Sequence, residues 1–276
     1  MRYTSKDLVE MLSYPRPARS QMEEAFITKY IKSVPGIKQD KFGNLYKKIA
    51  TSDVCFACHT DTVHHSQQNK RQQVHVSNDG WAFKQDNDVL GADDTTGVWI
   101  CLNLMSKKVP GLYIFHRDEE IGGQGSSFIL RNHPQLLKGI TKVVSLDRKD
   151  YHDVVIWQKG RLTASEEFGQ ALAQQLGHNF KTAKGVFTDS ANYTSIVPEC
   201  CNLSVGYFYA HSADEIQDLT FAEALLSWLS NINWKALPIK RVTTTPSTTQ
   251  QPKKQWVDDY WGYQDLNTFW TKDERR

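Results

Sequence analysis

The sequence of 276 residues lacks the features that would place it in a membrane or on nucleic acid. No apolar run approaches the roughly 20 residues that a membrane-spanning helix needs. The formal net charge is only +2, which gives no electrostatic reason to expect a nucleic-acid or membrane-surface partner. No internal repeat is visible. These absences favour an ordinary globular protein. Its length is enough for one large α/β domain or two small ones.

Cysteine motifs are also scarce. Residues 55–59 spell Cys-Phe-Ala-Cys-His, the C-x-x-C-H pattern of covalent haem attachment. Haem attachment requires export, and the first fifteen residues carry Lys, Asp and Glu instead of an unbroken apolar core. The pair Cys200-Cys201 is not a second C-x-x-C that could complete a cysteine zinc site. We therefore expect free, buried thiols in a reducing compartment, and a cytoplasmic protein.

What the sequence does contain is a series of short acidic and histidine-bearing clusters. Imidazole and carboxylate groups are ligands that suit zinc, and cobalt or manganese accept the same atoms. One candidate ligand per cluster gives two histidines and three carboxylates. This set is too large for one open tetrahedral zinc, but it suits two zinc ions that share a bridging carboxylate. The five candidates are His59, Asp93, Glu120, Asp147 and His211.

The clusters follow segments that have the composition of buried strands. Apolar runs at 54–58, 111–115 and 142–146 end at His59, at 116–120 and at Asp147, and a fourth run, 202–210, ends at His211. Open α/β sheets place their sites at the carboxyl ends of the strands. A helical pattern over 93–107 would set Asp93 and Asp94 at a helix amino terminus, where the macrodipole favours carboxylates.

In this order, the clusters resemble the di-zinc exopeptidase superfamily of aminopeptidases, tripeptidases, carboxypeptidases and N-acyl amino-acid deacylases. The matching segments read CHTDTV, LGADDTTGV, DEEIGGQGS, SLD and YAHSADE, with DKFGN at 40–44 before the first of them. The resemblance covers residues 20–235. It implies an α/β fold of three layers, in which helices cover both faces of a mixed, mostly parallel sheet, as in phosphorylase/hydrolase-like zinc exopeptidases.

The resemblance also implies a role for each candidate. His59 and Asp147 would hold one zinc, Glu120 and His211 the other, and Asp93 would bridge them. Asp61 would orient the His59 imidazole. Glu119 would act as the general base that takes a proton from the attacking water. Adjacent side chains of an extended segment point in opposite directions, so Glu119 and Glu120 are expected to have different roles.

Spacing predicts a compact member of this superfamily. Only 64 positions separate Asp147 from His211, and 34 separate His59 from Asp93. These intervals leave room for a strand, a helix near 165–177 and a loop, but not for an inserted lid domain. The wording of HTDTV and LGADDTTGV is closer to the tripeptidases, whereas the layout is closer to single-domain aminopeptidases.

Without a lid domain, the oxyanion and the ends of the substrate must be held by other residues. The segment 187–193 lies where relatives build the substrate pocket, and it suggests Tyr193 as an oxyanion donor. An aminopeptidase needs an acidic group for the free amine, and Asp189 or Glu215 could serve. A carboxypeptidase or deacylase needs a cation for the substrate carboxylate; the guanidinium fork suits that role, and Arg148 and Arg161 are the available choices.

The last part of the chain differs in composition. We expect a catalytic domain over residues 1–240, a linker rich in Thr, Pro and Gln over 241–254, and an aromatic, acidic tail over 255–276. So many large rings are not expected to be fully solvated. The tail is therefore predicted to dock on the catalytic domain or to bind a protein partner.

Three function classes follow from the sequence. The first is a co-catalytic di-zinc hydrolase, an aminopeptidase or small-peptide hydrolase, with carboxypeptidase or N-acyl amino-acid deacylase activity as the alternative on the same site. The second is a zinc-binding interaction module without catalysis. The third, an electron-transfer haem protein, is disfavoured by the absence of an export signal. The sequence does not identify the bond that is cut, the physiological metal or the oligomeric state.

Overall fold

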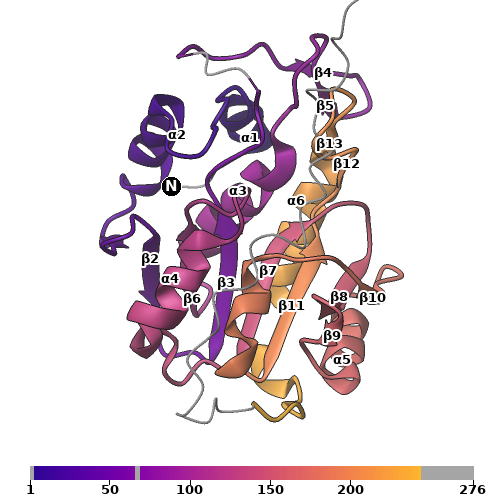
Figure 1. The fold of residues 1–276 in the computed structure, drawn as a ribbon. Helices are drawn as coiled ribbons and strands as arrows, with labels where there is room; N and C mark the ends of the chain where they lie inside the picture. Colours follow the sequence, from indigo (N-terminus) through magenta and orange to yellow (C-terminus); the bar gives the residue numbers. More distant parts are fainter. Residues whose placement is uncertain (1–2, 66–68, 244–276) are drawn as a thin grey trace, which may run out of the picture. The chain divides into compact units, whose positions relative to one another are not determined.

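The structure is a computed structural model that describes residues 3–65 and 69–243 (Figure 1). Within these residues the strands form a sheet of nine strands, in the order β1-β2-β6-β3-β7-β11-β8-β10 with β9 beside β8, and a sheet of four, in the order β12-β13-β5-β4. The strands are β1 Lys38–Gln39, β2 Leu45–Ile49, β3 Val54–His59, β4 His75–Val76, β5 Trp81–Phe83, β6 Gly111–His116, β7 Lys142–Arg148, β8 Asp153–Gln158, β9 Arg161–Leu162, β10 Lys181–Lys184, β11 Glu199–Ser204, β12 Tyr207–Phe208 and β13 Ile216–Asp218.

The centre of the large sheet is parallel. Strands β6, β3, β7 and β11 run in the same direction, whereas β2 pairs antiparallel with β6 and β8 pairs antiparallel with β11. In Figure 1, β3, β7 and β11 lie side by side in the middle of the fold. Because the four central strands are parallel, their carboxyl ends meet at one edge of the sheet. The expected mixed, mostly parallel sheet is confirmed.

Helices cover both faces of this sheet. The helices are α1 Ser5–Leu12, α2 Gln21–Phe26, η1 Ile27–Ile31 (a π-helix), α3 Ala92–Ser106, α4 Gln124–Asn132, α5 Glu166–Leu176 and α6 Leu219–Asn231, with 3₁₀ turns η2 Pro134–Leu137, η3 Asp189–Ser195 and η4 Trp234–Ala236. Alternate residues of β3 enter different cores: Phe56 and Cys58 pack with α1, α3, α5 and α6, and Cys55 and Ala57 pack with α4, η2 and η3. This alternation has the period of a strand that is buried on both faces, and it confirms the three-layer α/β fold.

The segment between Asp147 and His211 contains the elements that its length allows. It forms β8, β9, α5, β10, η3, β11 and β12, and no inserted domain. The expected helix near 165–177 is α5, whose first turn is capped by the Ser165 hydroxyl and whose last turn ends at Gly177. No helix within 3–65 and 69–243 combines the length and the apolar character needed to cross a bilayer.

The predicted fourth strand, 202–210, is wrong as a single element. Strand β11 ends at Ser204, Gly206 adopts a left-handed conformation with φ +87°, and β12 then joins the second sheet. A side chain at Gly206 would overlap the ring of Phe221, so the chain can turn there only with glycine. His211 therefore follows a strand of the small sheet and not a strand of the large one.

Most of the predicted linker and all of the predicted tail lie outside the described residues. The linker's first residues are described, and they are hydrogen-bonded to the folded part of the chain before them. The Arg241 guanidinium donates to the carbonyls of Thr194 and Val197, both at 2.6 Å. The backbone N–H groups of Lys240 and Arg241 donate to the buried carboxylate of Glu199 at 2.7 and 3.0 Å.

Helix α3 approaches the sheet most closely at Gly97. A Cβ atom at this position would overlap the carbonyl oxygen of Leu146 in β7 and the carboxylate of Asp94. We predict that Gly97→Ala lowers the free energy of unfolding by about 3 kcal/mol, because the backbone of α3 must move away from the sheet. Urea denaturation would measure the loss.

Gly139→Ala is the matched control for this substitution. Unlike Gly97, Gly139 has a positive φ of +82°, and a Cβ atom there would meet nothing within 4 Å. Its expected cost is only the backbone strain, about 1 kcal/mol. Equal losses in the two variants would contradict the close packing of α3 on β7.

Candidate active site

Two loops that leave neighbouring strands are held together by Asp61. This buried carboxylate lies just beyond β3 and accepts hydrogen bonds from the backbone N–H groups of Glu119 and Glu120, both at 3.1 Å. The His59 imidazole is oriented mainly by the main-chain carbonyl of Asp61, 3.1 Å from Nδ1, while the Asp61 carboxylate lies 3.6 Å away. Asp61 therefore positions the imidazole through its backbone and the acidic loop through its side chain.

The five candidate ligands converge in two groups that share Asp93. His59 Nε2 lies 3.1 Å from Asp93 Oδ1 and 3.5 Å from Asp147 Oδ1. His211 Nε2 lies 3.2 Å from Asp93 Oδ2 and 3.3 Å from Glu120 Oε2. The two oxygens of Asp93 thus face different histidines. Each group offers three ligand atoms within 4.8 Å of one another, the arrangement that a bridging carboxylate between two metal ions requires.

The atoms of this cluster fit divalent cations. Glu120 Oε1 is buried and has no hydrogen-bond donor among the described residues. Such an unpaired buried acceptor is costly in a folded protein unless another group binds it. The donor set of two imidazole nitrogens and three carboxylates suits zinc, cobalt or manganese. His59, Asp93 and Asp147 could hold one ion, and Asp93, Glu120 and His211 the other.

The pKa values of the cluster are also those of groups that a divalent cation would stabilise. Burial raises the pKa of Asp147 to about 7, and the neighbouring Asp93 carboxylate adds to the rise. Burial and Asp93 also raise the pKa of Glu120. Hydrogen bonds to Asp93 and Glu120 raise the pKa of His211 to about 11. The raised pKa values mean that Asp147, Glu120 and His211 hold protons more strongly than usual, and divalent cations would compete with those protons.

Glu119 stands beside the two groups without belonging to either. It lines the same cavity as Asp93, Glu120 and Asp147. Burial raises the pKa of Glu119 well above its usual range; His59 opposes the rise and Asp147 strengthens it. A carboxylate that has a raised pKa and lies next to a metal cluster is suited to take up and release a proton.

Asp93 and Asp147 are fixed by residues that the local sequence did not indicate as partners. The buried carboxylate of Glu215 accepts the N–H groups of Gly91 and Asp93 at 2.8 and 3.1 Å. The Thr188 hydroxyl donates to Asp147 Oδ2 at 2.6 Å. The Asp93–Asp94 peptide bond is cis. Glu215, considered from sequence as a group for a substrate amine, instead holds the loop that carries Asp93.

A fully buried arginine fixes the backbone around His59. Arg16 Nε donates to the carbonyl of Thr60 at 2.7 Å, and its Nη2 donates to the Thr95 hydroxyl of α3 at 2.7 Å. Its charge also lies among the acidic groups of the cluster, since Asp61 and Asp94 raise its pKa against the larger lowering that burial causes. Sequence reasoning missed Arg16, and the only local signal is its position between two prolines.

The cluster opens into a cavity of about 340 Å³. Besides the candidate ligands, its lining includes the apolar residues Val155, Val186 and Phe187 and the basic residues Arg148 and Lys149. Arg148 is also tied to Asp153, with Nη2 3.1 Å from Oδ2. The structure thus brings Arg148 to the cavity that contains Glu119 and the candidate ligands.

Tyr193 and Asp189 do not reach this cavity. Tyr193 is fully buried, and its hydroxyl lies 2.6 Å from His116 Nε2. Asp189 Oδ2 lies 3.0 Å from His116 Nδ1, and Asp189 also accepts a hydrogen bond from the Ser126 hydroxyl. The expectation that these residues contact substrate is therefore corrected, because both are committed to a buried network between η3, α4 and β6.

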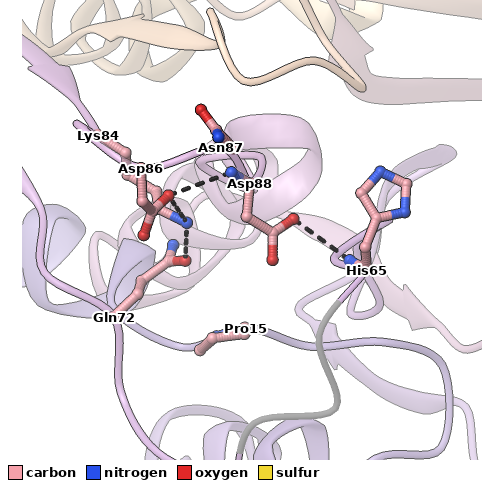
Figure 2. Close-up of a pocket in the computed structure, with 7 residues that line it drawn as sticks. All are labelled: Pro15, His65, Gln72, Lys84, Asp86, Asn87 and Asp88. Carbon is pink, nitrogen blue, oxygen red and sulfur yellow. Dashed lines mark hydrogen bonds and ion pairs between the residues drawn. The ribbon is translucent and has the colours of Figure 1, made fainter.

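A second hollow, of about 400 Å³, shares no lining residue with the first (Figure 2). Its polar groups pair with one another. Lys84 Nζ lies 2.9 Å from Asp86 and donates to Gln72 at 2.7 Å, while the His65 N–H donates to Asp88 at 3.2 Å. This pairing accounts for the charges that line the hollow without a ligand.

Comparison with known proteins gives a likeness of fold. No protein-family model matches the chain, and no curated protein matches it in sequence. Solved structures do match. The aminopeptidase PepT of Bacillus cereus aligns with a TM-score of 0.65 and 12% identity, over 82% of this chain and 95% of that one. The chain shares its fold with this aminopeptidase.

Two further structures support this result. A tripeptidase of Staphylococcus aureus aligns with a TM-score of 0.64 and 14% identity, over 83% of this chain and 96% of that one. The TET1 peptidase of Pyrococcus horikoshii, described as assembling into a tetrahedron or a large octahedral shell, aligns with a TM-score of 0.60 and 16% identity, over 81% and 98%. The predicted resemblance to exopeptidases thus agrees with the solved structures that share this fold.

The support that Glu215 gives to the loop of Asp93 can be tested through metal affinity. We predict that Glu215→Gln weakens binding of Zn²⁺ or Co²⁺ by about 10- to 100-fold. A glutamine has only one side-chain oxygen, so it can accept only one of the two N–H groups that the Glu215 carboxylate accepts from the loop of Asp93. Competition with a chromophoric chelator would measure the affinity. Asp214→Asn, at the exposed neighbouring position, is the matched control and should bind normally. Equal metal affinities in the wild type and both variants would show that Glu215 does not support the metal site.

Proposed function

We propose that this protein is a di-zinc hydrolase of peptide or amide bonds, and most specifically an exopeptidase that acts on short peptides. The observation that carries the proposal is the pair of three-residue groups that share Asp93 and open, with Glu119, into one cavity. Each group has the ligand atoms for one zinc. The likeness in fold to an aminopeptidase and a tripeptidase supports peptides as the substrate class.

The chain's own residues divide the chemistry between them. Zinc ions in the two groups would acidify a water molecule and polarise the scissile carbonyl. Glu119 takes the proton from the attacking water and returns it to the leaving amine. Asp61 holds the backbone of Glu119, so that the carboxylate faces the cavity. The apolar wall of Val155, Val186 and Phe187 excludes water and receives an apolar part of the substrate.

The direct test is metal content together with turnover. We predict about two metal ions per chain and hydrolysis of aminoacyl amides or short peptides. Glu119→Ala should keep the metal but lower kcat by at least about 100-fold, because the proton shuttle is lost. Elemental analysis and a coupled amine assay would measure the two quantities, with the exposed Glu167→Ala of α5 as the matched control.

Each outcome of this test has a clear meaning. Two metal ions without turnover of aminoacyl, dipeptide or N-acyl substrates would instead support a zinc-binding module without catalysis. A chain that binds no zinc, cobalt or manganese would show that the cluster is only a buried network of protonated carboxylates. Full activity in Glu119→Ala would assign the general base to another residue.

One observation favours a second candidate function. Arg148 and Lys149 line the cavity, and cations there could hold a substrate carboxylate, as a carboxypeptidase or an N-acyl amino-acid deacylase requires. Arg148 already has a carboxylate partner in Asp153. This existing ion pair is our reason for placing recognition of the amino end first.

The side chain of Arg148 separates the two functions. We predict that Arg148→Met changes kcat/KM on aminoacyl amides by less than about threefold, because those substrates have no carboxylate for Arg148 to bind. Steady-state kinetics on aminoacyl amides and N-acyl amino acids would measure the effect, with the exposed Arg131→Met as the control. A rise in KM of tenfold or more that is confined to carboxylate substrates would instead indicate the carboxypeptidase or deacylase.

A further inference from the structure

Gln158 stands out among the neutral polar residues of the cavity wall. The other two, Asn202 and Tyr207, are engaged with Asp147: Asn202 donates to its carbonyl and accepts its N–H, and the Tyr207 hydroxyl donates to the carbonyl at 3.2 Å. Gln158 is the last residue of β8 and only 1% exposed. Its Oε1 has no hydrogen-bond donor among the described residues.

The orientation of the Gln158 amide is fixed by two hydroxyl groups. Nε2 donates to Thr163 Oγ1 and Ser190 Oγ, both at 3.3 Å. Each hydroxyl uses its single hydrogen elsewhere, since Thr163 donates to the carbonyl of Ile156 at 3.1 Å and Ser190 to that of Cys201 at 3.2 Å. Both hydroxyls can therefore only accept from the amide. A flipped amide would place oxygen against oxygen, so Oε1 is the free end.

The neighbouring cations are held elsewhere. Lys159 Nζ lies 3.8 Å from the centre of the Phe187 ring and donates to Asn192 at 3.3 Å. The Arg161 guanidinium donates to the Thr194 hydroxyl at 2.9 Å. Neither side chain is bonded to Gln158 Oε1. A buried carbonyl oxygen without a donor is rare in folded proteins, and Gln158 itself is one of the residues that line the cavity.

We propose that Gln158 is a specificity-determining residue that accepts a hydrogen bond from an N–H group of the substrate. A peptide offers this chemistry from three sources: its terminal ammonium, the N–H of the scissile amide and the N–H of the next amide. Gln158 selects for one of them, because a molecule without that N–H leaves Oε1 buried and unpaired. The inference rests on the proposed function, since it treats the cavity as the peptide site.

Equilibrium binding tests this selection without turnover. The protein is Glu119→Ala loaded with zinc, and the probes are Ala-Gly-Gly and three analogues that each lack one N–H. These are propionyl-Gly-Gly, the peptide methylated at the first amide nitrogen, and the peptide with an ester in place of the second amide. Isothermal titration calorimetry gives each Kd with and without Gln158→Met. Metal content and melting temperature check the fold.

We expect Gln158→Met to weaken binding of Ala-Gly-Gly about tenfold. One analogue should bind both proteins equally, and that analogue identifies the N–H that Gln158 accepts. Gln175→Met, on the exposed side of α5, is the matched control and should change no Kd. Ser190→Ala loosens the amide without removing it, so it should give the same pattern with a loss of about threefold, even if Gln158→Met does not fold.

Three results would overturn the inference: an equal loss for all four probes, no loss for any probe, or no binding of any probe to the zinc-loaded protein. Failure of the proposed function has a different signature, because it is the absence of turnover by the wild-type chain on every peptide. If the wild type turns over peptides but Gln158→Met changes the Kd of no probe, Gln158 is not a specificity residue, and the proposed hydrolase function is unaffected.

Discussion

The crowding of buried carboxylates at the carboxyl edge of the parallel strands is the constraint on which the rest of the structure depends. Asp93, Glu120 and Asp147 approach two imidazoles closely enough to share protons. Such a group of like charges is unfavourable in a protein interior unless cations, protons or N–H donors compensate it. The surrounding architecture supplies these donors, and the proposed zinc ions would supply the remaining positive charge.

The loops that carry the cluster are held by residues far apart in the sequence. Arg16 connects the loop after β3 to the start of α3. Arg117 is buried against Glu23, with Nε 2.7 Å from Oε1, and so fixes the start of the acidic loop to α2. Glu215 holds the turn at Gly91 from the second sheet. These contacts explain why the geometry of the site depends on both sheets and on the amino-terminal helices.

The site is also asymmetric in its surroundings. His59 is buried, whereas the side chain of His211 is 51% exposed. The group that includes His211 therefore lies nearer to solvent, and the group that includes His59 lies deeper, beside Asp61. The cavity is lined both by apolar residues at 155 and 186–187 and by the basic pair at 148–149.

Residues at the ends of apolar runs were the predictable part of the candidate site. His59, Glu120 and Asp147 could be found because a polar residue that follows a buried parallel strand must lie at the carboxyl edge of the sheet. His211 was found by its motif, but its strand was not, because the left-handed turn at Gly206 divides the run. Tyr193 was assigned to the cavity wrongly, since its bond to His116 joins residues 77 positions apart.

The sequence by itself determined the fold class, the order of the polar clusters and the chemistry of their side chains. These depend on local pattern: alternation within strands, residues at strand ends and the ligand preferences of imidazole and carboxylate. Only the tertiary structure decided that the two oxygens of Asp93 face different histidines, that Glu215 supports a loop and that Gln158 keeps a free carbonyl. Each of these depends on contacts between distant segments, whose partners no local pattern specifies.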